Sequence, residues 1–299
     1  MTFTTDKEVL DWYENQPRVL TDEFIESIEW SKVKDHTFDP RFIPVIKYMR
    51  DVETLTDMYH RELRRTPTGK DPVISKFMER WGVEEVTHGE VLNRFLNEAG
   101  VTSDPSWQSD VRSAVSNVYH INTYLFTTMT NLVGSKFTGT HMAFGAVHEM
   151  TAAQSYRRLI ELVEHPVLTE ILKAIIREES THTNFYWNMA RLELEKSSFS
   201  RKMARFVVEN FWYPVGQGSL AKERTEYTVA TLFGAEGGVD ILDKTVTKRV
   251  ARLPGFGGVT KMTEKIGRIC RENPMHAIKQ AARSAALALV PSIMLNSVF

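Results

Sequence analysis

The sequence predicts an all-α protein built around a four-helix bundle. Between residues 39 and 196, apolar residues recur at spacings of three and four, which is the period of a helix with one buried face. The Gly, Pro and Asp clusters that end helices fall between these runs. With 42% hydrophobic and 25% charged residues, the chain has the composition of a globular protein. We expect a single domain, residues 1–299, with a bundle core at about 39–196.

Five long helices account for this core. We predict them at about 40–65, 72–98, 107–133, 139–164 and 167–196. The residues expected to cap their N-termini are Asp71, Ser103 or Asp104, and Thr138.

Smaller helices are expected to flank the core on both sides. An N-terminal helix at 20–32 should pack outside the bundle. Residues 200–299 should form a helical C-terminal extension that starts with a short helix near 200–212. Its final helix should open at Asn273-Pro274, because proline favours the first turn of a helix.

Charge is unevenly distributed along the chain. The formal net charge is −1, so we expect no nucleic-acid partner. From Arg201 onward, however, 15 Lys and Arg face 8 Asp and Glu, a net +7, whereas residues 1–200 carry a net −8. An acidic partner should therefore bind the C-terminal third.

The cysteine content and the apolar segments predict the cellular setting. A lone Cys270 excludes an intramolecular disulfide and an iron–sulfur cluster, so a redox enzyme of this sequence would need an external electron donor. The acidic N-terminus lacks the pattern of a signal peptide, which predicts a cytoplasmic location. The most apolar stretch, 285–295, contains Pro291 and is too short to span a bilayer, so no integral membrane contact is expected.

Two Glu-x-x-His units are the first candidates for chemistry. They are Glu85 to His88 and Glu179 to His182. Chance alone predicts about one such unit in this composition, so the motif by itself is weak evidence. Residues three apart on a helix project from the same side, however, and both units interrupt apolar stripes. Each unit should therefore turn one carboxylate and one imidazole into the core.

Glu53 and Glu149 interrupt apolar stripes on two further helices. Four buried carboxylates need compensating charge, which two divalent cations would supply. Two helices with a single Glu and two with Glu-x-x-His form the pattern of di-iron or di-manganese carboxylate bundles. The predicted metal ligands are Glu53, Glu85, His88, Glu149, Glu179 and His182.

Residues around these ligands receive weaker predictions. Glu84 and Glu178 could orient the two imidazoles, the alternative being that both are surface charges. We interpret His60, His120 and His148 as structural. The aromatic and Met side chains of the stripes could line a tunnel, although we expect most of them to pack the core.

The segments WGVEEVTHGEVLNRFLNEAG (81–100) and EESTH (178–182) resemble the soluble acyl carrier protein desaturases of the stearoyl type, which belong to the ferritin-like di-iron superfamily. The likeness covers about 40–215 and includes all six predicted ligands. It implies a homodimer with two iron ions per chain, Fe²⁺ in the reduced state, and O₂ as co-substrate. It also implies a ferredoxin-type electron donor and insertion of a cis double bond into a fatty acyl chain on acyl carrier protein. Both protein partners are acidic, as the basic C-terminal third would require.

Departures from that family leave other functions open. Ala152 stands where the family has a Thr near the O₂ pocket, with Thr151 beside it, so we expect proton delivery to differ. The closest alternative is hydroxylation or N-oxygenation of a carrier-bound or free substrate. Related N-oxygenases carry a third His where this chain has Ile175, which weighs against them. Iron storage is disfavoured by the long C-terminal extension, and a metal-free scaffold is disfavoured by the intact ligand set.

Overall fold

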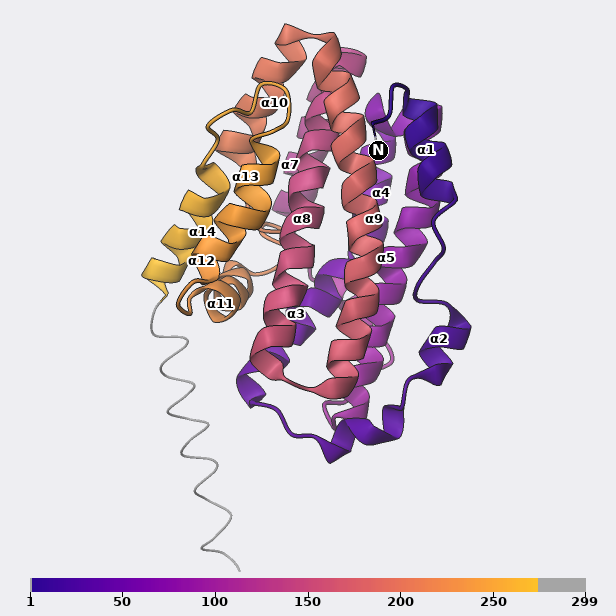
Figure 1. Ribbon diagram of the computed structural model, residues 1–299, viewed down its shortest axis with the longest axis vertical. Coiled ribbons are helices and arrows are strands. Elements are labelled where there is room, and N and C mark those ends of the chain that lie inside the picture. The colour runs from indigo at the N-terminus through magenta and orange to yellow at the C-terminus, as the bar shows by residue number, and fades with distance from the viewer. Residues whose placement is uncertain (1, 274–299) are drawn as a thin grey trace, which may run out of the picture.

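The computed structural model describes residues 2–273, which form helices and no strand. The all-α, ferritin-like bundle expected from the sequence is confirmed (Figure 1). Its four positions are filled by α3 (Ile43–Thr54) with α4 (Thr56–Arg64), α5 (Pro72–Glu98), α8 (Thr138–Val163) and α9 (Pro166–Lys196). The long α8 and α9 pack against each other, and α3 packs on α5.

Local capping sets the ends of the long helices. The Asp71 carboxylate accepts hydrogen bonds from the backbone N–H groups of Val73 and Ile74 and thereby starts α5, with Pro72 in the first turn. His165, which we did not predict as a cap, accepts from the N–H of Leu168 and starts α9. Thr138 does not cap α8 as expected, because a 3₁₀ turn, Gly134–Phe137, runs directly into the helix and makes Thr138 its first residue.

The helix predicted at 40–65 is interrupted. A 3₁₀ turn, Pro40–Phe42, precedes α3, and Leu55 separates α3 from α4. The Leu55 N–H donates to Val52 O at 3.1 Å, an i to i−3 bond that tightens the chain before α4 begins. No Gly or Pro lies at this break; the residue there, Leu55, is fully buried in the packed core.

The N-terminal prediction was also wrong in part. Instead of one helix at 20–32, the chain forms α2 (Asp22–Ser27), an extended residue Ile28 and a 3₁₀ helix, Trp30–Asp35. The extended conformation buries both Ile28 and Trp30. An unpredicted helix, α1 (Asp6–Glu14), lies against α5 and α9. A capping box starts it, in which Thr5 and Glu8 each satisfy a backbone N–H of the other.

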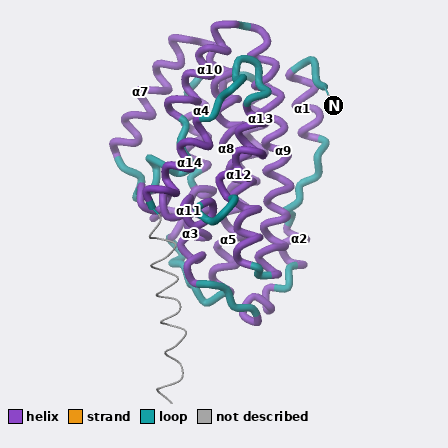
Figure 2. Tube along the Cα trace, turned by 60° about the vertical axis from the view of Figure 1, so that its left-hand side comes forward, coloured by secondary structure: helices purple, strands orange, loops and turns teal. Residues whose placement is uncertain are grey.

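The segment predicted as one helix at 107–133 forms α6 (Trp107–Ser113) and α7 (Asn117–Val133). Ser116 caps α7, whereas neither Ser103 nor Asp104 caps a helix; Asp104 instead accepts from the Ser106 N–H. The second helix, α7, packs on α4 and on the 3₁₀ turn before α8, and lies at the margin of the molecule in Figure 2.

The C-terminal extension packs beside α8 and α3 (Figures 1 and 2). It contains α10 (Ser198–Phe211), α11 (Lys222–Phe233), α12 (Gly238–Leu242), a π-helical turn (Asp243–Thr247), α13 (Lys248–Val250) and α14 (Lys261–Glu272). The predicted final helix that opens at Asn273-Pro274 lies outside the described residues. No helix within residues 2–273 is both long enough and apolar enough to cross a membrane.

Candidate metal centre

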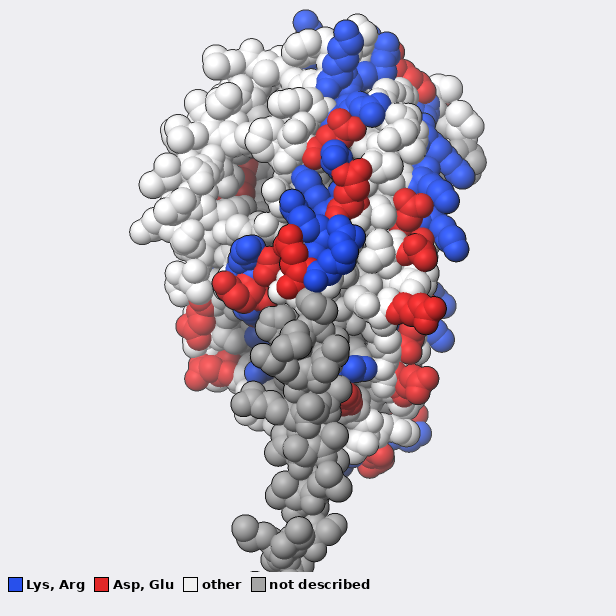
Figure 3. Space-filling model, turned by 90° about the vertical axis from the view of Figure 1, so that its left-hand side faces the viewer, with Lys and Arg blue, Asp and Glu red and all other residues white. Residues whose placement is uncertain are grey.

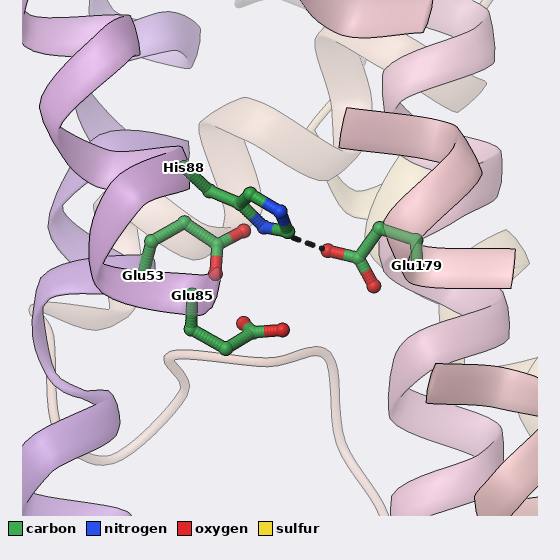
Figure 4. A group of neighbouring side chains, drawn as sticks. All are labelled: Glu53, Glu85, His88 and Glu179. Atoms are coloured by element: carbon green, nitrogen blue, oxygen red, sulfur yellow. Dashed lines mark ion pairs between the residues drawn. The ribbon is translucent and has the colours of Figure 1, made fainter. Parts of the chain in front are cut away.

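The six predicted ligands meet at one buried point between α3, α5, α8 and α9. None of the six residues is more than 7% exposed. They form two groups, within each of which the ligand atoms lie at most 4.8 Å apart. The first group contains Glu53, Glu85, His88 and Glu179 (Figure 4), and the second contains Glu85, Glu149, Glu179 and His182.

Glu85 and Glu179 belong to both groups. The arrangement can therefore hold two neighbouring cations, with these two carboxylates between them. Each cation would take one further carboxylate and one imidazole: Glu53 with His88, and Glu149 with His182. The Nδ1 atom of His88 lies 3.5 Å from Glu179 Oε1, and that of His182 lies 3.7 Å from Glu149 Oε2.

Unpaired polar atoms at this point fit a metal. Four buried atoms have no hydrogen-bond partner: Nδ1 of His88, Nδ1 of His182, Oε1 of Glu85 and Oε2 of Glu179. Two of them, His182 Nδ1 and Glu85 Oε1, lie 3.0 Å apart without hydrogen-bond alignment. Buried polar atoms are rarely left unpaired, so four of them around one point are best explained as ligand atoms.

Burial and neighbouring charges shift the pKa values of the buried carboxyl groups in opposite directions. Burial, together with the neighbouring Glu85 carboxylate, raises the pKa of Glu53 and of Glu179 well above the usual range. Burial also opposes ionisation of Glu85, but the adjacent His182 imidazole outweighs it and lowers the pKa of Glu85 to about 2. Protons thus perform, in part, the charge compensation that two cations would provide.

Each imidazole is oriented by a carboxylate from the opposite Glu-x-x-His helix. Glu178 Oε2 on α9 lies 2.9 Å from His88 Nε2, and Glu84 Oε2 on α5 lies 2.8 Å from His182 Nε2. Both carboxylates are buried, which excludes the alternative that they are surface charges. With Nε2 hydrogen-bonded in this way, each ring turns Nδ1 toward the centre, which is the arrangement expected of a metal-binding imidazole.

A comparison with known families decides the assignment. The family model described as fatty acid desaturase matches residues 46–211, more than half of the chain, and its span includes all six candidate ligands. The chain belongs to the fatty acid desaturase family. This membership confirms the resemblance seen in the Glu-x-x-His segments.

The chain is also similar, more distantly, to a solved structure. The X-ray structure of DesA2 from Mycobacterium tuberculosis H37Rv, described as a candidate acyl-ACP desaturase, matches with a TM-score of 0.47 and 18% identity. The match covers 72% of this chain and 75% of that one. No curated protein matches the sequence.

The N-terminal segment of the chain supports the centre through contacts that were not predicted from the sequence. Tyr13 on α1 donates its hydroxyl proton to Glu84 Oε2 at 2.9 Å, and Arg80 donates to Glu84 Oε1 at 2.8 Å. Burial opposes ionisation of Glu84, but the His182 hydrogen bond and Arg80 hold its pKa at about 2.

Glu178 receives similar support from the main chain. Its Oε1 accepts the backbone N–H groups of Val19 and Leu20 at 2.7 and 3.0 Å. Burial opposes ionisation of Glu178, but the His88 hydrogen bond and these two N–H groups lower its pKa. The capping box at Thr5 and Glu8 was the one sequence signal that could have located α1.

A cavity of about 470 Å³ adjoins the candidate metal centre. Carboxylates of the candidate ligands form part of its wall, as do Trp81 and Met49 from the predicted apolar stripes. Phe77 and Phe95, from the same stripes, are fully buried in the core. Some side chains of these stripes thus line the cavity and others pack the core, whereas a tunnel for an alkyl chain stays a prediction.

Thr151 and Ala152 also line this cavity. The Thr151 hydroxyl donates to Val147 O at 2.7 Å, so its proton is engaged by the helix backbone. His148 stacks on Phe144 and lies outside both ligand groups, and burial lowers its pKa to about 4. His60 and the exposed His120 also lie outside them.

Proposed function

We propose that this chain is an O₂-dependent di-iron acyl-[acyl carrier protein] desaturase that introduces a cis double bond into a carrier-bound fatty acyl chain. The observation that carries the proposal is the pair of overlapping ligand groups in the wall of a largely apolar cavity. Two iron ions, when bound, supply the activation of O₂ that protein side chains cannot. Membership of the fatty acid desaturase family supports the acyl substrate.

The protein's own residues would position the reactants. Glu53, Glu149 and the two shared carboxylates would hold the cations, with His88 and His182 completing the two ligand groups. Apolar cavity residues such as Met49 and Phe144 would bind the methylene chain and exclude water from it.

We propose acyl carrier protein and a ferredoxin-type electron donor as the partners. Both are acidic, and Figure 3 shows Lys and Arg gathered in a band over the C-terminal helices, with some Asp and Glu among them. Exposed basic residues of the C-terminal extension include Lys202, Lys248, Arg252, Arg268 and Arg271. Such a band would accelerate association with an acidic partner at low ionic strength.

We also propose a homodimer, formed through α7. This helix contains no Lys, Arg, Asp or Glu, and it exposes seven large hydrophobic side chains: Val118, Ile121, Tyr124, Leu125, Phe126, Met129 and Leu132. An apolar patch of this kind is typical of an interface, and a second copy would cover it by two-fold symmetry. Light scattering should give about 68 kDa, twice the 34.3 kDa chain, and Leu125→Glu should halve that mass.

The metal assignment is tested by iron content. We expect about two iron ions per wild-type chain, and loss of iron with retained helical circular dichroism in Glu85→Ala and in His182→Ala. His148→Ala, which alters a histidine outside both groups, is the matched control. Unchanged iron content in both ligand variants would refute the assignment.

The reaction is tested by reducing the iron-loaded protein without oxygen and then adding O₂ with acyl carrier protein that bears chains of fourteen to eighteen carbons. Mass analysis of the acyl group should show the loss of two hydrogen atoms. A gain of one oxygen atom would instead indicate a hydroxylase, and no change with any chain would refute the acyl substrate.

The cytoplasmic location remains a proposal based on the sequence alone.

A further inference from the structure

A buried carboxyl group, Glu62, lies in the cavity wall away from the metal centre. Glu62 is on α4, nine positions after Glu53, and its residue is 9% exposed. The two residues lie on successive helices, α3 and α4, with the break at Leu55 between them. Glu62 therefore marks a second polar region of the same cavity, outside both ligand groups of the metal centre.

The groups that contact Glu62 are polar and uncharged. Tyr119 on α7 donates its hydroxyl proton to Glu62 Oε2 at 3.2 Å. Tyr59 and Ser219, which also line the cavity, lie 2.8 Å apart through their hydroxyl oxygens. Within residues 2–273, no Lys, Arg or His lies within ion-pair distance of Glu62, although Arg61 and Arg65 act on it at longer range and lower its pKa. Burial outweighs them and raises its pKa to about 7.

The carboxyl group of Glu62 is only partly hydrogen-bonded. It accepts one hydrogen bond, at Oε2, while Oε1 accepts none and stays accessible in the cavity, so the group retains unused acceptor capacity. The saturated acyl portion of the proposed substrate offers only methylene and methyl groups, so that portion would leave Oε1 without a partner. A purely apolar substrate therefore fits this end of the cavity poorly.

We infer that the cavity binds an alkyl chain carrying a hydrogen-bond donor, a hydroxyl or an ammonium group, which Glu62 accepts while Tyr119 holds the carboxyl in place. The inference rests on the proposed function, because it concerns the substrate class of the same cavity. It places the donor in the part of the cavity lined by α4 and α7, away from the carbons at the metal centre. Glu62 would thus determine specificity without taking part in the oxidation.

The opposing interpretation is that Glu62 serves only to hold α7 on α4 through Tyr119. In that case the cavity would not distinguish chains with and without a donor. The two interpretations therefore differ in ligand preference and can be separated by binding alone, without turnover.

The test uses two isomers of equal size, 1-decanol and 1-methoxynonane, with 1-aminodecane as the cationic probe. Calorimetry on the full-length protein, without oxygen, should show 1-decanol and 1-aminodecane binding about tenfold to a hundredfold more tightly than the ether, the range expected for one hydrogen bond to a charged group. Glu62→Leu should abolish both preferences. Glu79→Gln, an exposed carboxylate on α5, is the control and should retain them.

A second variant covers the case in which Glu62→Leu fails to fold. Glu62→Gln keeps an acceptor oxygen but no charge, so it should retain the preference for 1-decanol and lose most of the preference for 1-aminodecane. Equal affinity of the wild type for the three probes would overturn the inference, as would preferences that persist in Glu62→Leu or an unaltered amine preference in Glu62→Gln. Because no reaction is measured, a failed desaturase assay leaves this result interpretable.

Discussion

Binding of two metal ions to the metal-free centre should release protons at pH 7, up to about four for the two ions. Burial raises the pKa of Glu53 and Glu179, so both carboxyls hold a proton in the metal-free protein. Burial disfavours the charged form of His88 and His182, but the carboxylates around them outweigh it and raise both pKa values. Two carboxyl and two imidazole protons must leave before these groups can bind two cations.

The expected size of the effect follows from this proton count. Each proton released changes the metal-binding free energy by about 1.4 kcal/mol per pH unit, so up to four change it by at most about 5 kcal/mol per pH unit for the two ions together. The sign is fixed because protons compete with metal: binding strengthens as pH rises and weakens as pH falls. The dependence should extend upward until the raised pKa values are passed.

The measurement is calorimetric titration of metal-free protein with Fe²⁺, without oxygen, in two buffers that differ in ionisation enthalpy. The difference between the apparent enthalpies gives the number of protons released. His148→Asn, a histidine outside the ligand groups, should release the same number as the wild type. Release of fewer than about two protons for two bound ions would show that the carboxyls and imidazoles are already deprotonated, and would refute the electrostatic account of the centre.

Three further predictions concern single side chains. Glu178→Gln removes the charged acceptor of His88 and should weaken metal binding about tenfold to a hundredfold in a chelator competition; unchanged affinity would mean that the ring is oriented by packing alone. Gly145→Ala would place a methyl group 2.4 Å from the Tyr186 ring, so urea unfolding should show a loss of about 1–3 kcal/mol, and a stability equal to wild type would contradict the packing. Burial raises the pKa of Glu62 to about 7, so the contribution of this group to stability is lost as pH rises from 4.5 toward 7. In urea unfolding, Glu62→Gln should therefore match the wild type near pH 4.5 and be more stable at pH 8.5 by at most about 3 kcal/mol. A difference in stability that stays constant across this pH range would exclude the titration of a buried Glu62.

The sequence predicted the parts of the structure that local chemistry determines. The predicted helix 72–98 matches α5 because its cap Asp71 and its first-turn Pro72 act within a few residues. The break at Leu55 was missed because it involves no Gly or Pro and accompanies burial in the fold. The unpredicted α1 carries a capping-box signal at Thr5, but the helix has only nine residues and therefore a short apolar pattern.

The site, like the fold, was predictable only where local sequence carried a signal. The six candidate ligands were recognisable because charged residues on apolar stripes are costly to bury, and a pair of bound cations explains all of them at once. The supports of Glu178 were not, because the Val19 and Leu20 N–H groups lie about 160 positions away in the sequence and donate through atoms common to every residue. The cavity was equally hidden, since Trp81, which lines it, and Phe77, which does not, are similar side chains on one stripe.

The contacts of residues 13–20 with Glu84 and Glu178 affect the order in which the molecule is assembled. In the sequence this segment precedes its partner Glu178 by about 160 residues. The support of both imidazoles is therefore complete only after α9 has been made and the N-terminal segment has packed against it. A shortened protein that starts after residue 21 keeps every candidate ligand. It lacks, however, the Tyr13 hydroxyl and the two backbone N–H groups that hydrogen-bond to Glu84 and Glu178. We expect such a protein to fold into helices and to accumulate without iron.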